Sequence, residues 1–174
     1  MSEQDRARPL VGIVLGSDSD VPSLEPALAV LRQFDVPAEM TIASAHQSPD
    51  RADAYARDAE TRGLKVVIAA AGAAAHLAGV LAGRTVLPVI GVPLAGTPLG
   101  GLDALLSTVQ MPSGVPVATV AIGGARNAAL LAVQILATGD AALRERYRAY
   151  KARLAQEVEE KSARLAGRTQ PGGP

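Results

Sequence analysis

Short, uninterrupted apolar runs alternate along the chain with longer segments in which apolar residues recur every three or four positions. Apolar runs of five or six residues are typical of strands buried on both faces of a parallel sheet, and the wider spacing is typical of helices. The pattern predicts strands at Leu10–Leu15, Glu39–Ala43, Lys65–Ala70, Val86–Gly91 and Pro116–Val120. It predicts helices at Val21–Phe34, Pro49–Arg62, Ala74–Ala82, Leu102–Val109 and Asn127–Ala137.

This strict alternation predicts an α/β fold in three layers, with a doubly wound, five-stranded parallel sheet covered by helices on both faces. We expect the flavodoxin-like strand order 2-1-3-4-5. Such a sheet binds its ligands outside the carboxyl ends of the strands, at the switch point between the first and third strands. The loops that follow the first three strands are therefore the candidates for a site.

The pattern changes after Thr138 to one long, charged helix, predicted at residues 141–165. Its apolar residues form a single stripe, which packs either on a neighbouring subunit or on its own domain. Residues 1–166 are predicted to form one domain that includes this helix, and 167–174 a disordered tail. The stripe consists of Leu143, Tyr147, Tyr150, Leu154 and Val158.

Composition narrows the class of protein. A chain of 174 residues with 48% hydrophobic and 20% charged residues suits one soluble globular domain. Seventeen basic residues balance seventeen acidic ones, so no net charge favours nucleic acid or a membrane surface as a partner. The absence of cysteine excludes disulfides and thiolate nucleophiles, and two histidines do not suffice for a metal site of their own. The charged N-terminus and the lack of a long apolar stretch lead us to expect a cytoplasmic protein.

The loop after the first strand reads Gly16-Ser17-Asp18-Ser19-Asp20 and leads directly into a helix. Hydroxyls and backbone N–H groups at such a position suit a phosphate or a ribose. The alternative is that Ser19 or Asp20 simply caps the helix. One capping group would suffice, however, and this loop supplies four polar side chains.

The loops after the second and third strands each carry one of the two histidines. In the second, Ser44 to Ser48, His46 is a candidate acid and base because histidine both donates and accepts protons near neutral pH. In the third, small residues would let a planar ligand approach the backbone, and N–H groups would meet a carboxylate. A structural histidine and a tightly packed turn are the alternatives. The candidate residues of the third loop are Ala71, Gly72, Ala73, Ala74, His76 and Leu77.

Six separated blocks, in order and with matching spacing, resemble the N5-carboxyaminoimidazole ribonucleotide mutase family: GSDSD, SAH, AGAAAHLAG, PVIGVP, GLDALLSTVQMPSGVPVATVAIG and NAALLAVQILA. The resemblance implies a homo-octamer that moves a carboxylate from the exocyclic nitrogen to the ring carbon of an aminoimidazole ribonucleotide in purine synthesis. It implies no metal, ATP or biotin.

By position, the resemblance makes His46 the acid and base, with Ser44 beside it. It also implies that Ser17, Ser19 and Asp20 hold the phosphate and ribose, and that Ser44 and Ala71 to Ala74 line a pocket for the carboxylate. Gly16, Gln47, His76 and Leu77 complete the expected substrate contacts.

The chain departs from the family pattern at several positions. Gln47 stands where the mutases have arginine and the related carboxylases lysine, and Ala70 and Ala73 replace glycines. Either the protein is a mutase that holds the phosphate another way, for instance through Arg126, or it carboxylates or decarboxylates a different, unphosphorylated heteroaromatic. A non-catalytic nucleotide-binding oligomer is a third hypothesis, against which His46 and Ser44 argue.

Overall fold

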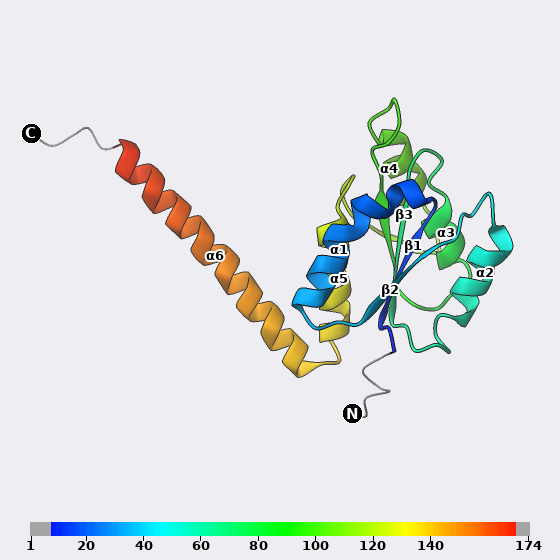
Figure 1. Cartoon of the computed structure of the whole chain (residues 1–174), viewed down its shortest axis with the longest axis horizontal. Helices are drawn as coiled ribbons and strands as arrows, with labels where there is room; N and C mark the ends of the chain where they lie inside the picture. The colour runs from blue at the N-terminus through cyan, green and yellow to red at the C-terminus, as the bar shows by residue number, and fades with distance from the viewer. Residues whose placement is uncertain (1–7, 170–174) are drawn as a thin grey trace, which may run out of the picture.

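The computed structural model describes residues 8–169, which form a parallel sheet with helices on both faces (Figure 1). The five strands lie in the order β2-β1-β3-β4-β5, so the predicted fold class and strand order are confirmed. In the centre of the sheet, Ile13 is paired with Met40 on one side and Ile68 on the other. The strands are β1 (Val11–Leu15), β2 (Ala38–Ile42), β3 (Val66–Ala71), β4 (Val89–Pro93) and β5 (Ala118–Thr119).

The helices cover both faces of the sheet and bury two apolar clusters. Helices α1 and α5 lie side by side on one face, and α2 and α3 lie on the other (Figure 1). Alternate residues of β1 supply the two clusters: Ile13 packs towards α1 and α5, and Val14 towards α2 and α3. The helices are η2 (Asp18–Asp20), α1 (Val21–Gln33), α2 (Pro49–Asp58), α3 (Leu77–Ala82), α4 (Leu102–Val109), α5 (Ala125–Ala137) and α6 (Ala141–Thr169).

Several predicted boundaries were wrong by two to four residues, for local reasons. β4 begins at Val89 rather than Val86, whose side chain is 81% exposed and belongs to the connection before the strand. α3 begins at Leu77 rather than Ala74, because the N–H groups of Ala75 and His76 bond to carbonyls two residues earlier and form a tight turn. β5 is shorter than predicted: it has two residues and pairs only with β4.

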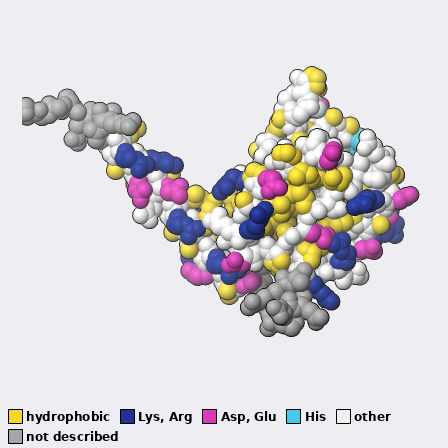
Figure 2. All heavy atoms as spheres, viewed as in Figure 1, with side chains coloured by type: hydrophobic (Ala, Val, Ile, Leu, Met, Phe, Trp, Pro, Cys, Tyr) yellow, Lys and Arg dark blue, Asp and Glu magenta, His cyan; other side chains and the backbone are white. Residues whose placement is uncertain are grey.

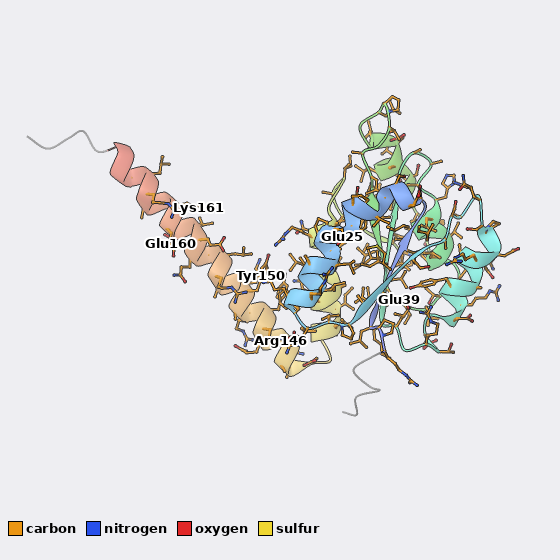
Figure 3. All side chains as sticks on the ribbon, viewed as in Figure 1. Glu25, Glu39, Arg146, Tyr150, Glu160 and Lys161 are labelled. Atoms are coloured by element: carbon orange, nitrogen blue, oxygen red, sulfur yellow. The ribbon has the colours of Figure 1, made fainter. Side chains whose placement is uncertain are left out.

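Helix α6 divides into an inner half that packs on its own domain and an outer half that does not. Tyr147 and Tyr150 lie against Phe34 of the domain, with ring centroids 5.9 and 5.5 Å apart. Beyond this contact Leu154 and Val158 are exposed, and the helix leaves the body of the molecule with basic and acidic side chains along it (Figures 1 and 2). Figure 3 shows Tyr150 near the domain, and Glu160 and Lys161 on the projecting part.

The apolar stripe therefore packs against its own domain over its first half only. The helix reaches Thr169, beyond its predicted end at residue 165, and residues 170–174 of the predicted tail lie outside the described residues. No helix among the described residues has the length and apolar character needed to cross a membrane.

Candidate active site

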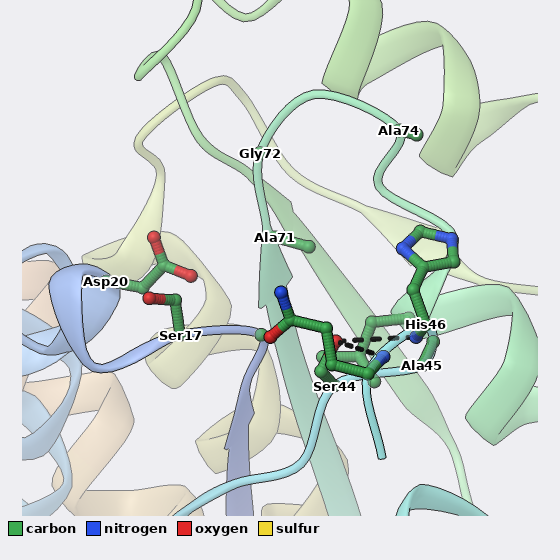
Figure 4. Close-up of a pocket in the computed structure, with 11 residues that line it drawn as sticks. Ser17, Asp20, Ser44, Ala45, His46, Ala71, Gly72 and Ala74 are labelled. Atoms are coloured by element: carbon green, nitrogen blue, oxygen red, sulfur yellow. Dashed lines mark hydrogen bonds between the residues drawn. The ribbon is translucent and has the colours of Figure 1, made fainter. Parts of the chain in front are cut away.

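A pocket of about 310 Å³ lies where the carboxyl ends of β1, β2 and β3 meet. These three strands are neighbours in the sheet although they are far apart in the sequence, so their following loops converge at one edge. Figure 4 shows Ser17 and Asp20 on one side of the pocket and His46 on the other, with Ala71 between them. The lining residues are Gly16, Ser17, Asp20, Ser44, Ala45, His46, Gln47, Ala71, Gly72, Ala74 and Leu77.

Three of the residues expected at the site, Ser19, Ala73 and His76, do not line this pocket, and Ala45 lines it without having been expected. An alanine offers no chemistry of its own, so only its position between Ser44 and His46 could have indicated it. Ser19 and His76 contact lining residues: the Ser19 hydroxyl lies 2.9 Å from the Ser17 hydroxyl, and His76 is hydrogen-bonded to His46.

In the first loop, Ser17 caps a helix and Asp20 faces the pocket. Ser17 caps the short helix η2, because its Oγ accepts a hydrogen bond from the backbone N–H of Ser19 at 3.3 Å. Asp20 occupies the N-cap position of α1 but makes no capping hydrogen bond with its side chain, and it lines the pocket instead. The carboxylate of Asp20 is therefore available to a ligand.

The environment of Asp20 disfavours its charged form. Burial raises the pKa of its carboxyl above the ordinary value of 3.8; a hydrogen bond with the Ser17 backbone opposes this, and the nearby charge of Asp18 adds to it. A carboxylate that loses hydration without gaining a cationic partner costs stability in the absence of a ligand. Ligand hydroxyl groups that donate hydrogen bonds to Asp20 would recover part of that cost.

The second loop is held by Ser44. Its Oγ accepts hydrogen bonds from the backbone N–H groups of His46 and Gln47, at 3.3 and 3.1 Å. Its own N–H donates to the Ser48 hydroxyl at 2.9 Å, just before α2 begins. Ser44 thus fixes the backbone on which His46 stands, and its hydroxyl proton remains as a group that can bond to a ligand.

The two histidines of the chain contact each other. The His46 Nε2 and His76 Nδ1 atoms lie 2.8 Å apart, and the two rings meet edge to face with centroids 5.0 Å apart. One ring donates its N–H to the other, which leaves the second nitrogen of His46 for a ligand in the pocket. His76 is the N-cap residue of α3, so the packing of α3 against α2 sets the relative position of the two imidazoles.

No group of three or more His, Asp or Glu side chains within residues 8–169 has the geometry of a metal site. The pocket instead combines hydroxyls, one carboxylate and one imidazole, opposite a loop of small residues. These groups suit a sugar and a flat, polar ring, and an imidazole is able to exchange protons near neutral pH.

A family model described as AIR carboxylase matches residues 10–157. The chain belongs to the AIR carboxylase family. It is 56% identical over 158 residues to the N5-carboxyaminoimidazole ribonucleotide mutase of Pyrococcus horikoshii, covering 91% of this chain and 89% of that protein. It is likewise 56% identical over 164 residues to the mutase of Mycobacterium tuberculosis H37Rv, covering 92% and 94%. The solved structure of PurE from Treponema denticola superposes with a TM-score of 0.83 at 30% identity, covering 91% of this chain and 99% of that one.

A residue with a strained backbone lies beside the pocket. Ala73 has a φ of +52° in a turn closed by hydrogen bonds from Ala75 N–H to the Ala73 carbonyl and from His76 N–H to the Ala74 carbonyl. An alanine in this left-handed conformation costs about 1–2 kcal/mol. The turn places Ala74 and Leu77 in the pocket lining.

Ala73→Gly is expected to raise the free energy of unfolding by about 0.5–1 kcal/mol, since the relief of strain exceeds the extra entropy that glycine gains in the unfolded chain. Chemical denaturation measures this change. Ala74→Gly is the matched control: residue 74 does not have a positive φ, so the same substitution should lower stability there. A destabilisation of similar size at both positions would show that Ala73 is not strained.

Asp20→Asn is expected to stabilise the ligand-free protein at pH 7. Because folding raises the pKa of this carboxyl, the ionised group is costly above its folded pKa, and the cost disappears as the pH falls through that pKa and below 3.8. The free energies of unfolding of the two proteins, measured by denaturation at several pH values, should therefore become equal towards acid pH. A difference that stays constant with pH would rule out titration of Asp20 as its cause.

Proposed function

We propose that the protein is an N5-carboxyaminoimidazole ribonucleotide mutase, an isomerase of purine biosynthesis that moves the carboxylate from the exocyclic nitrogen to ring carbon C4. The observation that carries the proposal is the 56% identity, over nine-tenths of the chain, with relatives that have this activity. The position of His46 beside a pocket for a flat ligand supports it. We place the reaction in the cytoplasm, because a phosphorylated precursor does not cross membranes freely.

The reaction needs one proton delivered and one removed. When the bond between nitrogen and the carboxyl carbon breaks, carbon dioxide leaves. The electron pair of the broken bond stays on the nitrogen, which takes a proton. Ring carbon C4 then attacks the carbon dioxide and loses its own proton. Atoms and charges balance without oxidation or phosphoryl transfer, so the proposed route uses no cofactor.

His46 is assigned both proton steps. It donates a proton to the departing nitrogen and accepts the one released from C4, so the imidazole returns to its starting state after each turnover. His76, at 2.8 Å, orients the ring and can accept or donate the hydrogen bond as the charge on His46 changes. In this assignment His76 is a positioning residue, and Ser44 holds the loop while offering its hydroxyl to the carboxylate.

The other lining residues bind the substrate. Ser17 and Asp20 are assigned to the ribose end, with Gly16 and Gln47 beside them, because hydroxyl and carboxylate groups pair well with sugar hydroxyls. Ala71, Gly72 and Ala74 are assigned to the ring and its carboxylate, because small side chains leave the backbone N–H groups accessible.

We further propose that the protein functions as a homo-oligomer, an octamer as the family resemblance implies. In the single chain His46 is exposed, so carbon dioxide formed beside it would escape unless another surface closed the pocket. Two groups of exposed apolar side chains are available for such contacts. One lies on the outer half of α6, at Leu154 and Val158, and the other lies on α4, at Leu102, Leu106 and Val109.

Light scattering of the purified protein is expected to give the mass of several chains. Replacing Leu154 and Val158 together by glutamate should reduce that mass, because charged side chains would have to be buried in the contact. Ala152→Glu, on the same exposed part of α6 but outside the apolar stripe, is the control that should leave the mass unchanged. A single-chain mass for the unchanged protein would contradict the assembly.

His46→Asn is expected to lower kcat at least about 100-fold, since acid–base catalysis contributes roughly 10²–10⁴ to the rate. The assay follows purified protein with N5-carboxyaminoimidazole ribonucleotide and measures both its decarboxylation and its conversion into the C4-carboxylated isomer. Circular dichroism and light scattering should show an intact fold and assembly in the variant. Isomerisation that persists in the variant would remove His46 from the mechanism, and an unchanged protein without turnover would refute the mutase assignment.

A further inference from the structure

The pocket supplies no full positive charge of the kind that a ribonucleotide requires. A phosphate monoester carries a charge of about −1.5 to −2 near pH 7. Among the described residues that line the pocket there is no lysine or arginine, and the ionisable groups there are the Asp20 carboxylate and the His46 imidazole. Asp20 repels a phosphate, and the uncharged Gln47 does not offset that repulsion. A cation just outside the lining would supply the missing charge.

Within residues 8–169, two cationic side chains lie at the carboxyl edge of the sheet, each in the first turn of a helix: Arg51 in α2 and Arg126 in α5. The other lysines and arginines lie on later helical turns or towards the opposite edge. Arg51 donates a hydrogen bond to Thr41 Oγ1 at 3.2 Å and lines a separate pocket beneath α2, together with Glu39 and Arg62. Its guanidinium is thus engaged beside the edge strand β2.

Arg126 is exposed and makes no hydrogen bond or ion pair within the described residues. Its neighbour Ala125 is fully buried in the cluster beneath α1 and α5, which anchors the first turn of α5. The Arg126 guanidinium is therefore an unpaired cation, among the described residues, on a backbone anchored by its buried neighbour.

The packing of α1 against α5 brings Arg126 towards the pocket. Both helices begin at the carboxyl edge of the sheet and run back side by side, and α1 follows directly after Asp20 (Figure 1). Packed helix axes lie about 8–10 Å apart, a separation that a long arginine side chain can bridge. The Ser17 and Asp20 side of the pocket is the side on which α1 begins.

Resting on the proposed function, we propose that Arg126 binds the 5′-phosphate of the ribonucleotide. An arginine presents its donors as a planar fork that matches phosphate oxygens. The chain would then bind its substrate with Asp20 on the ribose hydroxyls and Arg126 on the phosphate beyond them.

Calorimetric titration with ribose 5-phosphate and with aminoimidazole ribonucleotide tests the assignment in the assembled protein. Arg126→Ala should weaken the binding of both ligands by roughly ten- to hundredfold, the usual range for a lost hydrogen bond to a charged group. The affinity for the unphosphorylated riboside should not change. In turnover, KM should rise while kcat is retained, because the phosphate lies far from the reacting atoms. Arg51→Ala is the matched control and should leave all of these values unchanged.

A second substitution tests whether the phosphate lies between residues 47 and 126. Adding Gln47→Arg to the Arg126→Ala protein should restore most of the lost affinity for ribose 5-phosphate. The inference is overturned if Arg126→Ala leaves phosphate affinity unchanged, if it weakens the riboside equally, or if Gln47→Arg restores nothing. It is also overturned if the unchanged protein binds no ligand in a phosphate-dependent way. Turnover by the unchanged protein is a separate measurement, so failure of the mutase assignment is distinguished from failure of this one.

Discussion

Burial of the sheet on both faces is the constraint on which the rest of the structure depends. The residues of β1 that contact α1 and α5 and those that contact α2 and α3 are all inaccessible to solvent, so every strand connection must cross a face of the sheet as a helix. Each helix runs antiparallel to the strand before it, which places each strand-to-helix loop at the carboxyl edge. The site is a consequence of this arrangement, because three of these loops meet where β2, β1 and β3 are neighbours.

The core stabilises local arrangements that are unfavourable by themselves. Ala73 is held at a positive φ, and the Asp20 carboxyl is partly desolvated without a side-chain cation to pair with. Both lie in loops whose ends are fixed by fully buried strands. Such features gather at ligand sites because surrounding packing can impose a geometry that the local sequence does not favour.

The same packing sets the chemistry of His46. Ser44 fixes the loop backbone through two accepted hydrogen bonds, and His76 fixes the ring from a different loop. These contacts hold the imidazole in the orientation that the proposed proton transfers would use. The His46 side chain is nevertheless exposed in the isolated chain. In the proposed reaction this exposure would connect catalysis to assembly, because retention of carbon dioxide would need a second surface over the pocket.

The amino-acid sequence by itself determined the class of fold and the edge at which a site would lie, because alternating apolar patterns report burial over whole elements. The strand order was expected from the type of fold, and the strand pairings established it. It also indicated most of the pocket lining, since polar residues after β1 and β2 and small residues after β3 stand out against apolar strands. The tertiary structure decided what depends on the meeting of distant segments. It brought His46 and His76 into contact, turned Asp20 from a capping candidate into a pocket residue, and divided α6 into a packed and a projecting half. These relations depend on how helices pack across the sheet, and local periodicity contains no information on contacts between residues 30 or more positions apart.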